Sequence, residues 1–297
     1  MHKRLKIYSV ITSIGVLIVL LQGALVTKTG SGEGCGATWP LCFGEVIPTN
    51  PAIETIIEYS HRIVSGLAGA MIIILAIWAW KQLKHMREAK ALSFAAVILI
   101  IFQGLLGAGA AVFGQSKAIL ALHFGISAMS LAAVVLLTIL AFEDGREHTM
   151  APKVSRGFKY YVFFVITYCY GVIYSGAYVK HSEATLACDG LPLCNGQIFP
   201  GLYGPGGAHY FHRVAGTILL LFLLILMIWT LSRYRHYRVL TWTAVLSFLL
   251  VVAQFISGIS IVFTQNALSV GLIHTLIISK LFSALSYMAM IITRPSH

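Results

Sequence analysis

Residues 212–228 read HRVAGTILLLFLLILMI, and residues 61–77 read HRIVSGLAGAMIIILAI. Each stretch opens with a His-Arg pair and then continues without another charged side chain. A helix on the surface of a soluble protein would carry a polar face, whereas a transmembrane helix requires roughly 20 consecutive apolar residues. Both stretches are therefore predicted to enter a membrane, with the His-Arg pair close to one of its surfaces.

The rest of the chain has the same apolar character. Its 297 residues are 58% hydrophobic and only 10% charged, with a mean hydropathy of +0.84, whereas about a quarter of the residues of a soluble domain are charged. Residues 7–26 are expected to form a spanning helix and not a removable signal peptide, because no small-residue cleavage site follows them. Eight such stretches predict an all-α polytopic membrane protein. They cover residues 7–26, 58–80, 92–112, 120–142, 158–179, 209–231, 239–262 and 271–292.

The net charge of +11 comes from lysines and arginines that cluster in alternate connections between the apolar stretches. This distribution does not indicate a nucleic-acid partner, because short cytoplasmic loops of membrane proteins are enriched in these residues. We therefore expect a cell-membrane protein with both termini cytoplasmic and with the long connections 27–57 and 180–208 extracellular. The clustered residues are Lys3, Arg4, Lys6, Lys81, Lys84, Arg87, Lys90, Arg146, Lys153, Arg156, Lys159, Arg233, Arg235, Arg238 and Arg294.

The second half of the chain repeats the first at an offset of 151 positions. Four helices in each half would give both halves the same orientation in the membrane. We expect two tandem four-helix bundles, residues 1–150 and 151–297, related by a pseudo-twofold axis along the membrane normal. The matching residues are His61 and His212, Gln103 and Gln254, and His123 and His274.

Each of the two long connections contains a pair of cysteines, Cys35 with Cys42 and Cys188 with Cys194. Paired thiols on the oxidising side of a membrane favour a disulfide bond in each connection. A redox-active pair and a metal site are the alternatives, although neither connection has a convincing set of four zinc ligands.

Four histidines are predicted at one depth, near the outer ends of their helices: His61, His123, His212 and His274. Polar groups inside a membrane are expensive and usually functional. Two imidazoles from facing helices of one bundle suit the iron of a haem. The alternative is that each imidazole is hydrogen-bonded to a helix carbonyl. His209 is a further ligand candidate, but His212 is preferred because it keeps the 151-residue offset.

The two halves differ three residues before the His-Arg pair, where the first half has Glu58 and the second has His209. A carboxylate beside one haem can accept protons or activate water, or it can be an acid favoured by the helix dipole. Arg62 and Arg213 are candidates for contacts with haem propionates, with snorkelling to the interface as the alternative.

Several other residues of the helices have no single interpretation at this stage. The glycines of the third and seventh helices allow a helix to approach a macrocycle or simply another helix. Gln103 and Gln254 would find partners in any bundle, so they are assigned no role. No role is evident for Lys280 in the last helix.

Taken together, these residues resemble the haem A synthase family, and the resemblance covers nearly the whole chain. The pattern as a set is specific, although each piece alone is weak. It closely resembles the short bacterial members, which carry both cysteine pairs. The residues that carry it are Cys35, Trp39, Pro40, Leu41, Cys42, Glu58, His61, Arg62, His123, Cys188, Cys194, His212, Arg213 and His274.

The resemblance implies an oxidoreductase that converts the C8 methyl of haem O to the formyl of haem A, for terminal oxidases. The family route is two successive hydroxylations, after which the geminal diol loses water. It implies that His61 and His123 hold the substrate haem O, and that His212 and His274 hold a haem b cofactor. The enzyme that makes haem O, a protohaem farnesyltransferase, is an expected partner.

The resemblance also implies roles for two further residues of the first half. Glu58 is the expected acid or base at the substrate methyl. Cys35 and Cys42 are expected to form a disulfide that stabilises the loop over the substrate site, with Cys35 as a candidate redox group.

Two points stay open at this stage. Two imidazoles saturate an iron, so either one histidine of the first half releases during turnover, or the iron removes electrons while water supplies the oxygen. The rival functions are a di-haem b electron carrier that handles quinol and a non-enzymatic haem transporter or chaperone. A carboxylate at Glu58, without a counterpart in the second half, favours the oxidoreductase over both.

Overall fold

The computed structural model describes residues 2–114, 116–145 and 151–295, and throughout these ranges the long elements are helices. Eight of them are long and apolar enough to cross a membrane, which confirms the predicted all-α polytopic fold. They are α1 Lys3–Thr29, α2 Ile53–Gln82, α3 Arg87–Phe113, α4 Lys117–Glu143, α5 Arg156–His181, α6 Gly204–Arg233, α7 Arg238–Phe263 and α8 Leu268–Ile292, with a short 3₁₀ helix η1 at Ser31–Glu33. Arg146, one of the clustered positive residues, lies outside the described residues.

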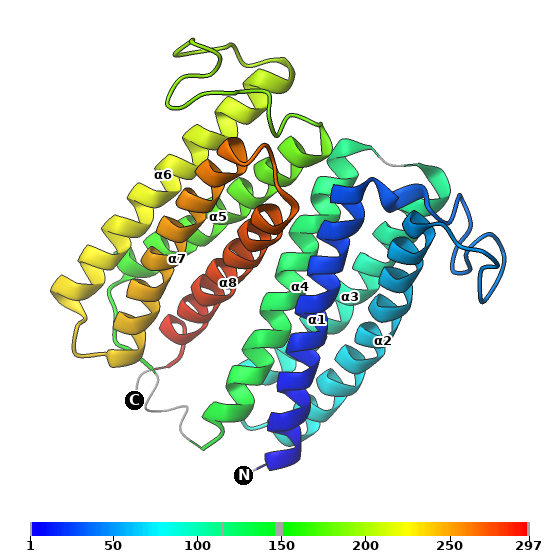
Figure 1. Ribbon diagram of the computed structural model, residues 1–297. Coiled ribbons are helices and arrows are strands. Elements are labelled where there is room, and N and C mark those ends of the chain that lie inside the picture. The colour runs from blue at the N-terminus through cyan, green and yellow to red at the C-terminus, as the bar shows by residue number, and fades with distance from the viewer. Residues whose placement is uncertain (1, 115, 146–150, 296–297) are drawn as a thin grey trace. The chain divides into compact units, whose positions relative to one another are not determined.

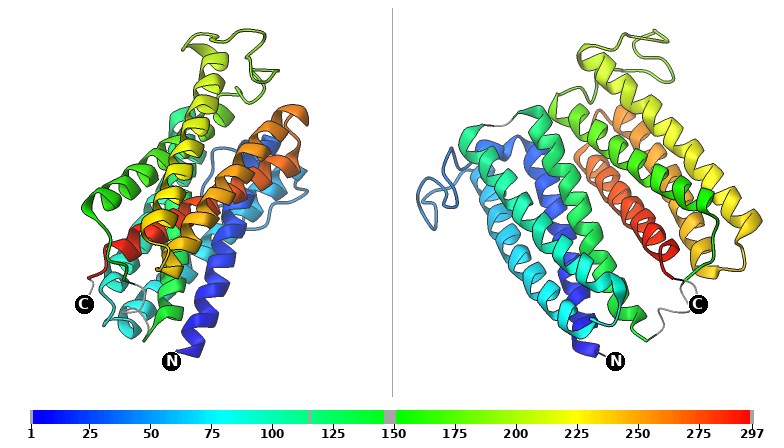
Figure 2. Two further views of the ribbon diagram at one scale, coloured as in Figure 1. Left: turned by 90° about the vertical axis from the view of Figure 1, so that its left-hand side faces the viewer. Right: turned by 180° about the vertical axis from the view of Figure 1, so that it is seen from behind.

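The chain divides into two compact units, Met1–Asp144 and Gly145–His297. In the first unit each helix packs against the next, and α4 packs against α1, so that the four helices close into a ring (Figure 1). In the second unit α5 to α8 close in the same order (Figure 2). The long connection between the first two helices of each unit is the part that extends from the bundle. The pseudo-twofold relation between the units stays a prediction.

The first unit presents apolar side chains outward along a helix. On α1, four isoleucines at helical spacing are each about half exposed: Ile7, Ile11, Ile14 and Ile18, at 52%, 52%, 53% and 46%. Water would disfavour such a stripe, whereas lipid accommodates it, since lipid leaves only backbone and polar groups in need of internal partners. The opposite face of α1 contacts α4 through a hydrogen bond of 2.8 Å between the hydroxyls of Ser13 and Thr138.

All eight helices begin earlier than the sequence predicted, and the two that carry the His-Arg pairs are among those with the largest difference. α2 begins at Ile53 and α6 at Gly204, whereas the apolar stretches predicted starts at residues 58 and 209. Hydropathy identifies only the part of a helix that lies in lipid, and the first turns of both helices are polar or glycine-rich. The His-Arg pairs therefore lie more than two turns inside their helices and not one turn, as the apolar stretches suggested.

Candidate functional site

The four histidines that match at the 151-residue offset occupy the same helix positions in the two units. His61 is the ninth residue of α2, and His212 is the ninth residue of α6. His123 is the seventh residue of α4, and His274 is the seventh residue of α8. At about 1.5 Å per residue, the two histidines of each unit lie at closely similar heights above the starts of parallel, diagonally opposed helices.

Within each unit the two imidazoles come from diagonally opposed helices of the ring. In the first unit the diagonal helices α2 and α4 also contact each other directly. All four histidines are half-buried. The predicted pairing is therefore compatible with the arrangement of each bundle.

A glycine on the preceding helix lies against the ring of each histidine. A Cβ atom added to Gly23 of α1, Gly107 of α3 or Gly258 of α7 would lie 3.4 Å from Cε1 of His61, His123 or His274. The fourth contact is tighter, because a Cβ on Gly176 of α5 would lie only 2.7 Å from Cε1 of His212. These glycines thus leave room for the imidazoles. This role is more specific than the close approach of two helices that the sequence alone suggested.

Two glutamines contact the histidines on their Nε2 side. The amide Nε2 of Gln103 donates to Nε2 of His123 at 3.1 Å, and that of Gln254 donates to Nε2 of His274 at 2.9 Å. The amide oxygens of both glutamines are buried and have no hydrogen-bond partner among the described residues. Gln103 and Gln254 had no role assigned from the sequence alone. The signal that could have identified them as partners of the histidines was their common spacing of 20 residues from His123 and His274.

Glu58 connects α2 to the first cysteine loop. Its side chain is buried, with the residue only 5% exposed. One carboxylate oxygen accepts the backbone N–H of Cys35 at 2.7 Å, and the other accepts a hydrogen bond from Arg62. Arg62 also donates to the carbonyl oxygen of Leu41 at 3.0 Å. The carboxylate and the guanidinium therefore hold the loop against the helix.

The second unit has the same connection with an imidazole in place of the carboxylate. Nδ1 of His209 lies 3.3 Å from the N–H of Cys188, and Nε2 lies 3.1 Å from Nε of Arg213. Arg213 also donates to the carbonyl oxygens of Gly190 and Cys188 at 2.7 and 2.9 Å. A neutral imidazole accepts only one hydrogen bond, whereas a carboxylate accepts both. We call each arrangement a loop latch: Glu58, Arg62 and the N–H of Cys35, or His209, Arg213 and the N–H of Cys188.

The two loop latches bear on two expectations from the sequence. Both ring nitrogens of His209 already have partners, the N–H of Cys188 in the loop and the guanidinium of Arg213 on α6, which supports His212 and not His209 as the ligand candidate. The guanidinium groups of Arg62 and Arg213 are bonded to loop carbonyls, and their contacts with propionates stay a prediction. Lys280 is an exposed residue of α8.

The cysteines of each loop are joined in disulfides, Cys35 with Cys42 and Cys188 with Cys194, as predicted. The two loops are built alike. The N–H of Cys42 donates to the carbonyl three residues further on at 3.2 Å, and that of Cys194 does the same at 2.9 Å. Both loops also contain a cis peptide bond before a proline. In the part of the chain that the structure describes, no three His, Cys, Asp or Glu side chains gather as a metal site.

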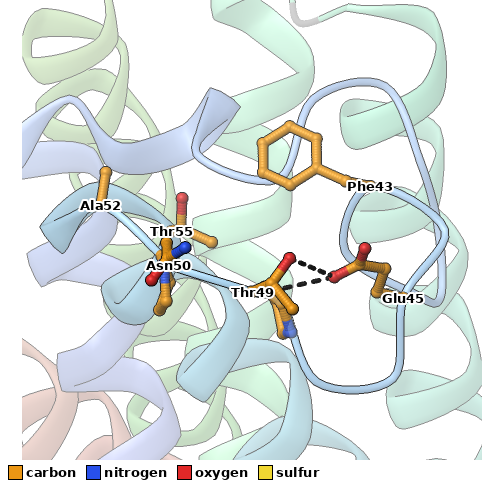
Figure 3. A pocket seen from close by; sticks show the side chains of 8 residues that line it. Phe43, Glu45, Thr49, Asn50, Ala52 and Thr55 are labelled. Atoms are coloured by element: carbon orange, nitrogen blue, oxygen red, sulfur yellow. Dashed lines mark hydrogen bonds between the residues drawn. The ribbon is translucent and has the colours of Figure 1, made fainter.

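A separate surface pocket of about 320 Å³ lies between the first cysteine loop and the start of α2 (Figure 3). Glu45 borders it and accepts hydrogen bonds from the N–H of Thr49 at 3.0 Å and from its hydroxyl at 3.4 Å. None of the four half-buried histidines lines this pocket, so it is distinct from the predicted porphyrin sites.

The residues around the histidines fit an iron porphyrin. Each unit offers two imidazoles with their rings set against glycine, and buried amide oxygens of Gln103 and Gln254 without hydrogen-bond partners. A pair of imidazoles from facing helices is a donor set that haem iron accepts, whereas zinc would require three or four ligands.

Comparison with known proteins decides the family. The family COX15-CtaA, described as cytochrome oxidase assembly protein, matches residues 6–286. A protein of Alkalihalophilus pseudofirmus named heme A synthase is 96% identical over 297 residues, the full length of both chains. Proteins of the same name from Halalkalibacterium halodurans and Shouchella clausii are 67% and 58% identical, with 99% of each chain covered.

The chain belongs to the COX15-CtaA family.

This membership confirms the resemblance that the cysteine, glutamate and histidine pattern indicated. It applies to both units of the COX15-CtaA fold, because the match extends from α1 into α8.

The close contact between Gly176 and His212 generates a prediction for this COX15-CtaA protein. Gly176→Ala would place a methyl group within 2.7 Å of the ring, which forces the imidazole from its place. We expect the haem content of the purified protein to fall several-fold, as measured by the pyridine haemochrome spectrum.

Gly171→Ala is the matched control, because a Cβ at Gly171 of the same helix meets no atom within 4 Å. Alanine at this position should leave the haem content unchanged and favour the helix slightly. Equal haem content in both variants would show that the Gly176 contact does not matter.

Proposed function

We propose that this protein oxidises the C8 methyl group of haem O to a formyl group and so forms haem A. Relatives of full length, up to 96% identical, are named heme A synthase. The observation that carries the proposal is the repeated pair of histidines with a carboxylate beside only one pair, at Glu58. Two permanent electron-transfer haems would not need that difference.

The two units are proposed to hold different porphyrins. The substrate haem O is assigned to His61 and His123 in the first unit. A haem b cofactor is assigned to His212 and His274 in the second unit. This assignment is supported by the loop latches, because the first unit places a carboxylate at the sixth residue of α2 and the second places an imidazole at the sixth residue of α6.

Haem b, when bound, supplies one-electron oxidation and reduction. The chain itself supplies position and proton transfer. Glu58 is held by the N–H of Cys35 and by Arg62, one helical turn from His61, on the side of α2 that carries the proposed ligand. When water supplies the oxygen atom, oxidation of a methyl group to a formyl group releases four protons and four electrons. The carboxylate of Glu58 is proposed to accept the protons, and the electrons would leave one at a time to an external one-electron acceptor.

The cysteine loop of the first unit is proposed to act through Glu58. Cys35 is fully buried and disulfide-bonded to Cys42, and its N–H fixes one oxygen of the carboxylate. The disulfide therefore limits the positions that the proton acceptor can adopt. We propose this as the basis for a catalytic contribution of Cys35.

The protein is a multi-pass membrane protein, and we propose its place as the cell membrane. Both termini are assigned to the cytoplasm and both cysteine loops to the outside, because the positive residues cluster in the alternate connections. Haem O is apolar enough to stay in lipid, which supports transfer from a neighbouring haem O synthase.

Pigment analysis tests the reaction directly. Cells that make haem O should accumulate haem O alone when this protein is absent and should form haem A when it is present. Extracted haems identified by mass would show the difference. Haem A in equal amounts with and without the protein would overturn the proposal and favour an electron carrier or a haem chaperone.

Removing one histidine from each unit should separate the two sites. His212→Ala is expected to strip tightly bound haem b from the purified protein, because the iron loses an imidazole. His61→Ala should retain that haem and stop haem A formation. Absorption spectra and haem mass analysis measure both effects. Loss of the retained haem in His61→Ala, with none in His212→Ala, would reverse the assignment of the units.

The role of Glu58 can be separated from its part in the loop latch. Glu58→Gln keeps an oxygen for the N–H of Cys35 but cannot accept a proton. If the carboxylate transfers protons, Gln and Ala variants should both lose about 10²–10⁴-fold in the rate of haem A formation, with haem b retained.

His209→Gln is the matched control, because it alters the latch of the second unit without removing a carboxylate. It should keep haem A formation within a few-fold of wild type. Near wild-type turnover by Glu58→Gln would limit Glu58 to holding the loop.

A further inference from the structure

The Nδ1 atoms of the four histidines have different surroundings in the two units. An imidazole that binds iron through Nε2 carries a proton on Nδ1, and that proton requires an acceptor. In the second unit, Oγ of Ser175 lies 2.9 Å from Nδ1 of His212, and Oγ of Ser257 lies 2.8 Å from Nδ1 of His274. Both serines come from the helix that precedes the helix of their histidine.

The other hydrogen bonds of these serines fix the direction of the contact. Ser175 donates to the carbonyl oxygen of Val172 at 2.9 Å, and Ser257 donates to that of Gln254 at 2.9 Å. A hydroxyl has one hydrogen to donate, so each serine oxygen is left to accept from Nδ1–H. The proton is thereby kept on Nδ1, and the lone pair stays on Nε2, where iron binds.

The Nε2 side of His274 is consistent with this tautomer. The amide of Gln254 donates to that nitrogen at 2.9 Å, so Nε2 presents a lone pair, and a bound iron would take the place of this amide. The partners of the two ring nitrogens of His274 thus indicate the same tautomer, with the proton on Nδ1.

The first unit lacks these acceptors. Nδ1 of His123 is buried without a hydrogen-bond partner in the described part of the chain. Nδ1 of His61 faces only Ser65 of its own helix, at 3.5 Å, a distance at which a hydrogen bond is weak. The imidazoles of the two units therefore differ in the partners of Nδ1, although their positions along the helices are identical.

The difference in Nδ1 partners corresponds to a difference in sequence, at the residue before each glycine that faces an imidazole. Serine precedes that glycine at both places in the second unit, in Ser175-Gly176 and Ser257-Gly258. In the first unit the corresponding residues are Gln22 and Leu106. Gln22 has a buried amide oxygen without a hydrogen-bond partner among the described residues, and leucine has no acceptor at all.

We propose that Ser175 and Ser257 are positioning residues that lock His212 and His274 in the iron-binding tautomer, so that the second unit retains its haem while the first unit exchanges its own. The inference rests on the proposed function, which assigns a cofactor to one unit and a substrate to the other. An acceptor at Nδ1 orients the ring before iron binds and makes the imidazole a stronger ligand. A substrate site must release its porphyrin after each turnover, and imidazoles without such acceptors are weaker ligands that favour release.

The test measures haem retention and haem potential in the purified full-length protein. Ser175→Ala and Ser257→Ala should each raise the rate of haem transfer to apomyoglobin by about 10–100-fold, the usual effect of removing a partner of a metal-bound histidine. Each should also shift the midpoint potential of the retained haem upward, because the imidazole becomes a poorer electron donor. Ser257→Thr keeps the hydroxyl and should restore both values.

Ser260→Ala is the matched control. Ser260 lies on the same helix and donates to the carbonyl oxygen of Ile256 at 2.9 Å, away from the histidine. Its haem transfer rate and potential should equal those of wild type. Wild-type rates and potentials in both serine-to-alanine variants would overturn the inference.

A gain of retention in the first unit provides a second, independent measurement. Leu106→Ser supplies an acceptor at the position that matches Ser257, and it should slow the release of porphyrin from the first unit after loading with haem. Release from this variant at the wild-type rate would contradict the inference. Failure of the proposed function is a separate outcome. It would appear as a second unit that holds no haem, with the same haem content in wild-type protein and in His212→Ala.

Discussion

Lipid offers no hydrogen bonds, so a polar side-chain atom between membrane helices costs free energy unless it finds a partner within the protein. An imidazole has two nitrogens, and this requirement acts on each of them. In the second unit both nitrogens of His274 have partners, a serine hydroxyl on one side and a glutamine amide on the other. Such a ring has one orientation and one tautomer. The glycine against it, Gly258, completes its surroundings by leaving space for Cε1.

The two units show how one scaffold supports two kinds of site. Helix order, histidine position, disulfide loop and loop latch are common to both. The differences that bear on the sites are side chains that contact these common parts: Glu58 against His209 in the latch, and Gln22 against Ser175 and Leu106 against Ser257 beside the imidazoles. The proposed division between substrate and cofactor therefore requires no difference in backbone architecture.

Sequence reasoning found the features that depend on composition and spacing. Eight apolar stretches predicted eight helices, and the 151-residue offset predicted which histidines correspond. It did not find the contacts that depend on how each helix is rotated about its axis. Gln254, Ser257 and Gly258 are near neighbours in the sequence, yet whether they face His274 is decided by packing between α7 and α8. The polar first turns of α2 and α6 were missed because hydropathy reports only the lipid-embedded part of a helix.

The loop latch limits which residues can stand at its centre in either unit. The residue at the centre of the latch, Glu58 or His209, must accept a hydrogen bond from the backbone N–H of the first cysteine of its loop. Codons for glutamate and histidine differ at two bases, and glutamine codons lie one base from each. Glutamine also carries an acceptor oxygen. A codon at this position can therefore change between an acid and an imidazole by single-base steps, and the side chain at each step carries an acceptor for the hydrogen bond that attaches the loop to the helix.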